Sequence, residues 1–138
     1  MAEQRSSGVP LIGRILMSSV FLVFGVMKLT TFGYYVQLAA GHSMPFPAAS
    51  IVAASVVEIL GGLAILAGFQ IEAVSWFLFV YLIPTSIIFH NYWALQGALK
   101  ANMEAHFFKN MAIMGGLLFL ATNGAGPYSV DAARAAKI

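Results

Sequence analysis

The fold is decided by the stretch Leu11–Leu29, which is LIGRILMSSVFLVFGVMKL. Only Arg14 and Lys28 are charged in it, and a helix of about 20 apolar residues crosses the hydrocarbon core of a bilayer. The residues lack the two-residue alternation of a membrane barrel strand. Because helices and closed barrels alone satisfy every backbone group in lipid, this stretch predicts a membrane-spanning helix.

Three later stretches have the same character, namely residues 48–67, 71–89 and 107–123. The connection 30–47 is long for a hairpin and contains several aromatic residues, which favours a short interfacial helix. Residues 91–106 are expected to form a polar loop. We therefore predict an all-α fold: a single domain over residues 1–138, with four transmembrane helices in a bundle and a short interfacial segment between the first two.

The composition excludes several other classes of protein. The chain has 138 residues, of which 60% are hydrophobic and only 9% are charged, and its mean hydropathy is +0.86. A soluble domain has about 25% charged residues. The net charge of +2 comes from scattered basic residues, so nucleic acid is not an expected partner. The chain has no cysteine, which excludes thiolate chemistry.

An even number of spans places both termini on the same side of the membrane. The first helix is expected to be retained, since no small-residue cleavage site follows it. Basic residues are divided between the two sides as Arg5, Arg14, Arg134 and Lys137 against Lys28, Lys100 and Lys109. Cytoplasmic loops carry the excess of Lys and Arg, so we expect both termini in the cytoplasm.

Glu58 is the outstanding polar residue, because it falls near the middle of the second predicted helix, where a charge costs about 2.5–3.5 kcal/mol. Its neighbours on the same face are small, which indicates packing against another helix. Counting from the ends of the apolar stretches places Glu58 level with residues 17–20, about one turn from Arg14 and roughly 14 Å from Lys28. We therefore expect an Arg14–Glu58 ion pair, either structural or functional.

A second polar group is expected at the other end of the first helix. Topology places several polar residues of the third and fourth helices in the same leaflet as Lys28. These side chains would form the mouth of a polar pocket whose floor is Glu58, although the lysines also suit simple snorkelling to headgroups. The candidate ligand-binding or polar-interior residues are Arg14, Lys28, Glu58, His90, Asn91, Lys109 and Asn110. No catalytic residue is assigned, and the histidine spacing does not predict a metal site.

Several short motifs occur in a characteristic order along the chain. They are Arg14, Phe24-Gly25-Val26-Met27-Lys28-Leu29, Glu58-Ile59-Leu60-Gly61-Gly62, Phe89-His90-Asn91-Tyr92-Trp93, Phe108-Lys109-Asn110 and Gly124-Ala125-Gly126-Pro127-Tyr128-Ser129-Val130-Asp131. The last is similar to a Gly-x-Gly-x-x-Ser-Leu-Asp ending. With these motifs the chain resembles the DoxX family of small four-helix membrane proteins over nearly its whole length.

The resemblance implies the bacterial inner membrane and an association with redox chemistry, because the family is named after a membrane subunit of a thiosulfate:quinone oxidoreductase. Other members are associated with oxidative-stress defence and thiol homeostasis. No redox-cofactor motif is evident, and quinone is the cofactor that a polar interior would suit. Any enzymatic activity would then be that of a subunit with a membrane or peripheral redox protein as its partner.

Three functions therefore remain open. The first is a membrane component of a quinone-linked or thiol/sulfur-linked redox system. The second is a non-enzymatic scaffold or assembly partner within the lipid bilayer. The third is a pathway for a small solute or protons, which would require a homo-oligomer because four helices are few for a monomeric transporter.

Overall fold

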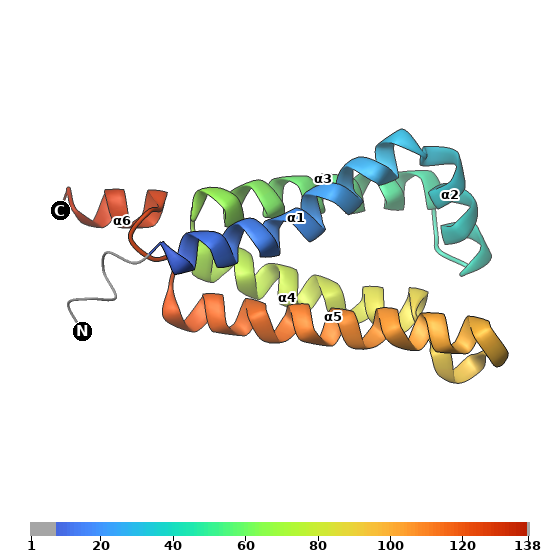
Figure 1. The fold of residues 1–138 in the computed structure, drawn as a ribbon. Coiled ribbons are helices and arrows are strands. Elements are labelled where there is room, and N and C mark those ends of the chain that lie inside the picture. Colours follow the sequence, from blue (N-terminus) through green and yellow to red (C-terminus); the bar gives the residue numbers. More distant parts are fainter. Residues whose placement is uncertain (1–7, 138) are drawn as a thin grey trace. The chain divides into compact units, whose positions relative to one another are not determined.

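The computed structural model describes residues 8–137. Arg5, one of the basic residues expected on the cytoplasmic side, lies outside the described residues. Within that range the chain is helical and has no strand, which confirms the all-α class. The elements are α1 (Val9–Thr30), α2 (Phe32–Gly41), α3 (Pro47–Ala67), α4 (Ile71–Phe89), the 3-10 turn η2 (Tyr92–Ala94), α5 (Gly97–Asn123) and α6 (Val130–Ala135) (Figure 1).

The chain divides into two compact units. The first unit comprises Met1–Ile71 and Ala125–Ile138, and its helices are α1, α2, α3 and α6. The second unit comprises Glu72–Gly124, with α4, η2 and α5. Each unit is described by itself below.

In the first unit, α1 and α3 lie side by side and run antiparallel (Figure 1). Two glycines allow this close approach. A methyl group on Gly25 would lie 2.8 Å from the Ile59 side chain, and one on Gly62 would lie 2.9 Å from that of Leu22. Because no side chain separates the backbones at these positions, the two helices pack tightly along their small-residue faces.

The connection between α1 and α3 contains the predicted short helix, which is α2. Its Ala39 is fully buried, and α2 packs against α3. Phe46 precedes α3 in the left-handed conformation, with a φ of 49°. Pro47 then begins α3, where its fixed φ and missing N–H are tolerated.

In the second unit, the last helix begins earlier than predicted. α5 starts at Gly97 rather than at residue 107, so the prediction of a polar loop over 91–106 was wrong for its last ten residues. These residues include Ala, Leu, Lys, Met and Glu, which are strong helix formers whatever their polarity. Hydropathy located the apolar part of the helix and missed the polar part that precedes it.

Three helical stretches of the described chain are long and apolar enough to cross a membrane: Val9–Thr30, Pro47–Ala67 and Ile71–Ala94. The protein is therefore a multi-pass membrane protein. α5 is longer than any of these, but its apolar part is interrupted by Lys109 and Asn110. A fourth span over residues 107–123 stays a prediction.

Candidate functional site

Glu58, on α3, forms an ion pair with Lys28 from the last turn of α1. The Lys28 Nζ lies 2.7 Å from the Glu58 Oε2, and the two side chains are 14% and 8% exposed. Gly25 makes this contact possible, since a methyl group there would lie 3.1 Å from the Glu58 Cβ. Close packing of α1 on α3 thus removes both charges from lipid and pairs them, which is the usual arrangement of charges inside membrane helices.

The predicted Arg14–Glu58 pair was therefore wrong. Gly25 lies against Glu58 and Leu22 lies against Gly62, so the register differs from the predicted one by about six residues, or about 9 Å. The ends of the two apolar stretches are not level. The first turns of α3 extend past the end of α1, where they pack against α2.

Two aromatic rings complete the surroundings of the Lys28 ammonium. Its Nζ lies 5.9 Å from the ring centroid of Phe24 and 5.3 Å from that of Tyr35. Tyr35 comes from α2, outside the membrane-spanning helices. Burial raises the pKa of its phenol, and the neighbouring Tyr34 and Glu58 raise it further. The sequence predicted a short interfacial helix with aromatic residues in this connection but not the position of Tyr35 over Lys28, because that contact depends on the fold of the α1–α2 connection.

Arg14 is fully buried and binds backbone carbonyl groups. Its Nη1 donates to Leu66 O at 2.6 Å and to Ile65 O at 3.3 Å, and its Nη2 donates to Tyr128 O. Ile65 and Leu66 belong to the last turn of α3, whose carbonyl groups have few N–H partners within the helix. Arg14 therefore caps α3 from a neighbouring helix and attaches the C-terminal segment to it.

Asp131 caps the start of the next helix, α4, where the backbone groups without partners are N–H donors. Its carboxylate accepts hydrogen bonds from the backbone N–H of Gln70 at 2.8 Å and of Ile71 at 2.9 Å, where α4 begins. Its own N–H donates to Gly68 O at 3.0 Å. The Ser129 hydroxyl begins α6 by accepting a hydrogen bond from Ala132 N at 3.1 Å.

These contacts converge on Gly68, which has a φ of 64°. A Cβ at this position would lie 2.5 Å from the Ser129 Cβ and 2.7 Å from the Arg14 Nη1. Both the left-handed backbone and the lack of space therefore require glycine. We call Arg14, Gly68, Ser129 and Asp131 the terminal clasp. The sequence signal for it was the ending Ser129-Val130-Asp131, whose role in joining two helix ends could not be seen from the sequence.

The second unit contains the other four predicted polar residues, and two of them lie beside His106. The rings of His90 and His106 are stacked, with centroids 5.3 Å apart. Lys109 Nζ lies 3.2 Å from the Nδ1 of His106. An ammonium group can only donate, so Nδ1 accepts and the ring proton of His106 is on Nε2. Burial lowers the pKa of His106, which precedes the predicted fourth span, and Lys109 lowers it further.

Asn110 and Asn91 have different surroundings within this unit. Asn110 is buried, and its Nδ2 donates to the Ser86 Oγ at 3.1 Å, which links α5 to α4. Asn91 precedes η2, and its backbone carbonyl oxygen accepts from the Ala94 N–H at 3.0 Å. The expected pocket that joins Lys28 and Glu58 to the residues of the second unit stays a prediction.

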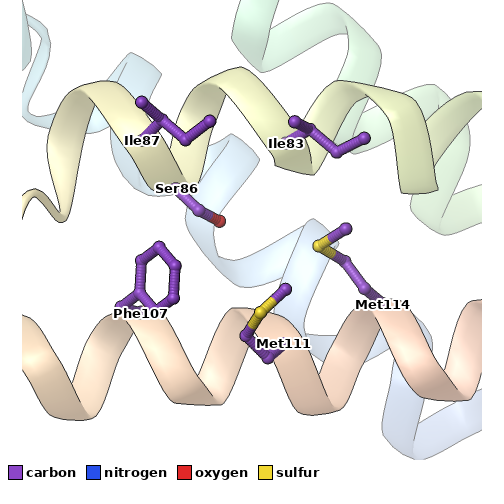
Figure 2. Close-up of a pocket in the computed structure, with 6 residues that line it drawn as sticks. All are labelled: Ile83, Ser86, Ile87, Phe107, Met111 and Met114. Carbon is purple, nitrogen blue, oxygen red and sulfur yellow. The ribbon is translucent and has the colours of Figure 1, made fainter.

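An apolar hollow of about 110 Å³ lies between α4 and α5. Its lining residues are Ile83, Ser86, Ile87, Phe107, Met111 and Met114 (Figure 2). The hydroxyl of Ser86 is already engaged, because it donates to Leu82 O at 2.7 Å and accepts from Asn110. The hollow therefore offers apolar contact and little hydrogen bonding of its own.

Comparison with known proteins agrees with this architecture. Residues 9–91 match the DoxX family. The inner membrane protein YphA of Escherichia coli is 34% identical over 121 residues, which cover 88% of this chain and 86% of YphA. The inner membrane protein YqjF of the same organism is also 34% identical over 121 residues, covering 88% of each chain.

A more limited similarity is found to the ER-derived vesicles protein ERV29 of Saccharomyces cerevisiae. It is 32% identical over 76 residues, which cover 55% of this chain and 24% of ERV29. No solved structure matches the chain. From the family match and the two bacterial relatives, together with the apolar helices, we conclude that the chain belongs to the DoxX family and is a multi-pass protein of the bacterial inner membrane.

Proposed function

We propose that the chain is a membrane component of a redox system linked to quinone or to thiol and sulfur compounds, and that quinone contacts it in the second unit. The observation that carries this proposal is the apolar hollow between α4 and α5, together with the stacked histidines of the same two helices. Quinone sites combine an apolar slot with one or two hydrogen-bonding groups. The hollow supplies the first of these and the histidines supply the second.

Helical spacing connects the hollow with the histidines. Ile83, Ile87 and His90 follow one another at spacings of four and three along the chain, so they continue one face of α4. On α5, His106 stacks on His90, which places it at the same end of the α4–α5 pair as the lining residue Phe107. With its Nδ1 occupied by Lys109, His106 has an Nε2–H that would donate to a quinone carbonyl oxygen. A quinone ring in the hollow would contact Phe107 and Met111.

The proposal requires a partner that exchanges electrons with the quinone. The chain has no cysteine, and among the described residues no three His, Asp or Glu side chains converge as a metal site would need. A membrane or peripheral redox protein would supply the second redox group. The role proposed for this chain is to bind and orient quinone in the bilayer.

Quinone binding is tested by filling the hollow. Met111 and Met27 are both 41% exposed, but only Met111 lines the hollow, so M27W is a matched control for M111W. Protein purified with native lipid is extracted, and its quinone content is measured for the wild type, M111W, M27W and H106Q. We expect M111W and H106Q to lose quinone and M27W to retain it. Wild-type protein without quinone, together with unchanged thiol and thiosulfate oxidation in M111W cells, would refute the proposal.

The proposal includes a fourth span over residues 107–123 and cytoplasmic termini. Because the chain has no cysteine, single substitutions such as S43C and K137C give unique labelling sites. Membrane-impermeant maleimide added to intact spheroplasts should label S43C and leave K137C unlabelled until the membrane is opened. Labelling of K137C alone would show the inverted orientation, and labelling of both would show an odd number of spans.

A second candidate function is a non-enzymatic scaffold or assembly partner. It is favoured by the first unit, where Lys28 is paired with Glu58 and Arg14 is bound to carbonyl groups. Charges satisfied within the protein in this way stabilise helix packing without any ligand. Crosslinking in native membranes should then recover a constant partner from wild-type and M111W cells alike, whereas recovery of no stable partner would count against a scaffold.

A further inference from the structure

The ammonium group of Lys28 is enclosed by groups from three different helices. The Glu58 carboxylate of α3 lies 2.7 Å away, the Tyr35 ring of α2 is 5.3 Å away and the Phe24 ring of α1 is 5.9 Å away. A carboxylate together with aromatic faces is the combination by which proteins recognise ammonium ligands. Two of these three groups lie outside the helix that carries Lys28, so the enclosure is built by the tertiary fold.

We propose that Phe24, Tyr35 and Glu58 form a binding site for a primary ammonium group, which the tethered ammonium of Lys28 fills. Lys28 is thus an internal ligand of this site. The chemistry of an external ligand would be the same, R–NH3+, and two sources supply it at a membrane: the headgroup of an ethanolamine lipid, and a small free amine.

The position of the site suits such a ligand. Lys28 lies in the last turn of α1, and its side chain is 14% exposed, so the site lies near the end of the membrane span and is not fully closed. A lysine near a helix end can also extend to the headgroup layer. If Lys28 leaves or is truncated, the buried Glu58 carboxylate loses this cation, which is strongly unfavourable. Another primary ammonium would relieve this cost.

The ligand class follows from the contacts. Glu58 Oε2 accepts a hydrogen bond at 2.7 Å, so a cation with an N–H group would keep this bond and is the expected ligand. A quaternary ammonium has none and is also bulkier. Truncation by K28A removes the lysine stem and leaves room for a short alkyl amine such as n-propylamine.

The test measures amine rescue of K28A in nanodiscs of phosphatidylcholine. We expect n-propylammonium chloride to raise the folded-to-unfolded ratio of K28A about tenfold when the free amine is at about ten times its Kd. Tetramethylammonium chloride at equal ionic strength should have no such effect. The double variant K28A/E58Q should not respond to either salt, and K100A, which truncates a lysine on α5, controls for general effects of amines.

Lipid composition then distinguishes the two sources of the ligand. If an ethanolamine headgroup reaches the site, nanodiscs that contain phosphatidylethanolamine should stabilise K28A without any free amine. If only free amines reach it, K28A should have the same stability in both lipids and respond to n-propylammonium in each. A response of K28A/E58Q equal to that of K28A would overturn the proposal, as would the absence of any response of K28A to amine or lipid.

A second variant keeps the proposal testable if K28A does not fold. In K28C the only thiol of the chain is at the position of the ammonium, and it can be alkylated in SDS before refolding. Bromoethylamine restores an ammonium at nearly the length of lysine, whereas bromoethanol adds a neutral group of similar size. We expect refolding to recover with the first adduct only. Equal recovery with the two adducts would show that the site needs side-chain volume and no cation.

Discussion

Lys28 and Arg14 both lie on the packed face of α1, but different groups neutralise them. Lys28 binds the carboxylate of Glu58 at 2.7 Å, and its Nζ lies within 5.9 Å of the centroids of two aromatic rings. Arg14 binds carbonyl groups of the last turn of α3 and of Tyr128. Asp131, the acid of the same clasp, is itself bound to backbone N–H groups at the start of α4.

The difference indicates different roles for the two places. In the terminal clasp each charge completes a helix end, so its geometry is fixed by backbone groups that lipid cannot satisfy. At Lys28 and Glu58 the two partners are side chains, and under the proposal above a free primary ammonium would take the place of the lysine ammonium. We therefore expect the terminal clasp to be structural and the Lys28 enclosure to be the exchangeable site.

The largest loss of stability is expected from R14M. It leaves the Leu66 carbonyl and the Tyr128 carbonyl without the guanidinium in a buried site, and we expect a loss of about 3–5 kcal/mol in the free energy of unfolding. The measurement is SDS titration of protein in mixed micelles. The matched control is R134M, because Arg134 is exposed and stacks on Phe69 at 4.7 Å; it should lose about 0.5–1 kcal/mol. Equal losses in R14M and R134M would show that Arg14 stabilises the protein no more than an exposed arginine does.

The next largest effect is expected from G25A at the Lys28 end. The added methyl would lie 2.8 Å from the Ile59 side chain and 3.2 Å from the Ile59 backbone nitrogen, so α1 and α3 must separate, at a cost of about 1–3 kcal/mol. G13A on the same helix meets nothing within 4 Å and should gain up to about 1 kcal/mol from helix propensity. If G25A were as stable as G13A, close helix approach would not be what holds Glu58 against Lys28.

A smaller effect is expected from D131N. The amide retains one acceptor oxygen for the two N–H groups at the start of α4, so about 1–2 kcal/mol should be lost. E72Q removes an acid of the first turn of α4 that is exposed, and the loss should be about 0.3–1 kcal/mol. The same SDS titration compares the two variants. A larger loss in E72Q would mean that general charge near α4, and not the hydrogen bonds of Asp131, stabilises this end.

The features that could be predicted from the sequence are those that depend on local pattern. Apolar length located α1, α3 and α4 to within two residues at each end, and the aromatic connection predicted α2. The burial of Glu58 followed from its small neighbours. These predictions succeeded because hydropathy and helical periodicity are properties of a single segment.

The features that could not be predicted depend on how segments meet. The partner of Glu58 required the register of α1 on α3, which Gly25 and Gly62 set through contacts with Ile59 and Leu22. The role of Asp131 required the C-terminal segment to return to the α3–α4 turn. The start of α5 required helix propensity to be weighed separately from hydropathy.

The smallest effect concerns a third cation, Lys109, whose Nζ lies 3.2 Å from the Nδ1 of His106. The pKa of His106 lies below its ordinary value, so the folded protein binds this proton less readily than the unfolded chain, and stability is lost as the pH falls through the ordinary value of about 6.5. Burial is the larger cause, so K109Q should raise the His106 pKa only part of the way towards that value and should reduce the loss of stability in acid.

NMR titration of the His106 ring, assigned separately from the stacked His90, measures the shift. K100Q removes another lysine of α5 and should leave the titration unchanged. An equal rise of the His106 pKa in K100Q would show that the general positive charge of α5, and not the contact at 3.2 Å, lowers this pKa.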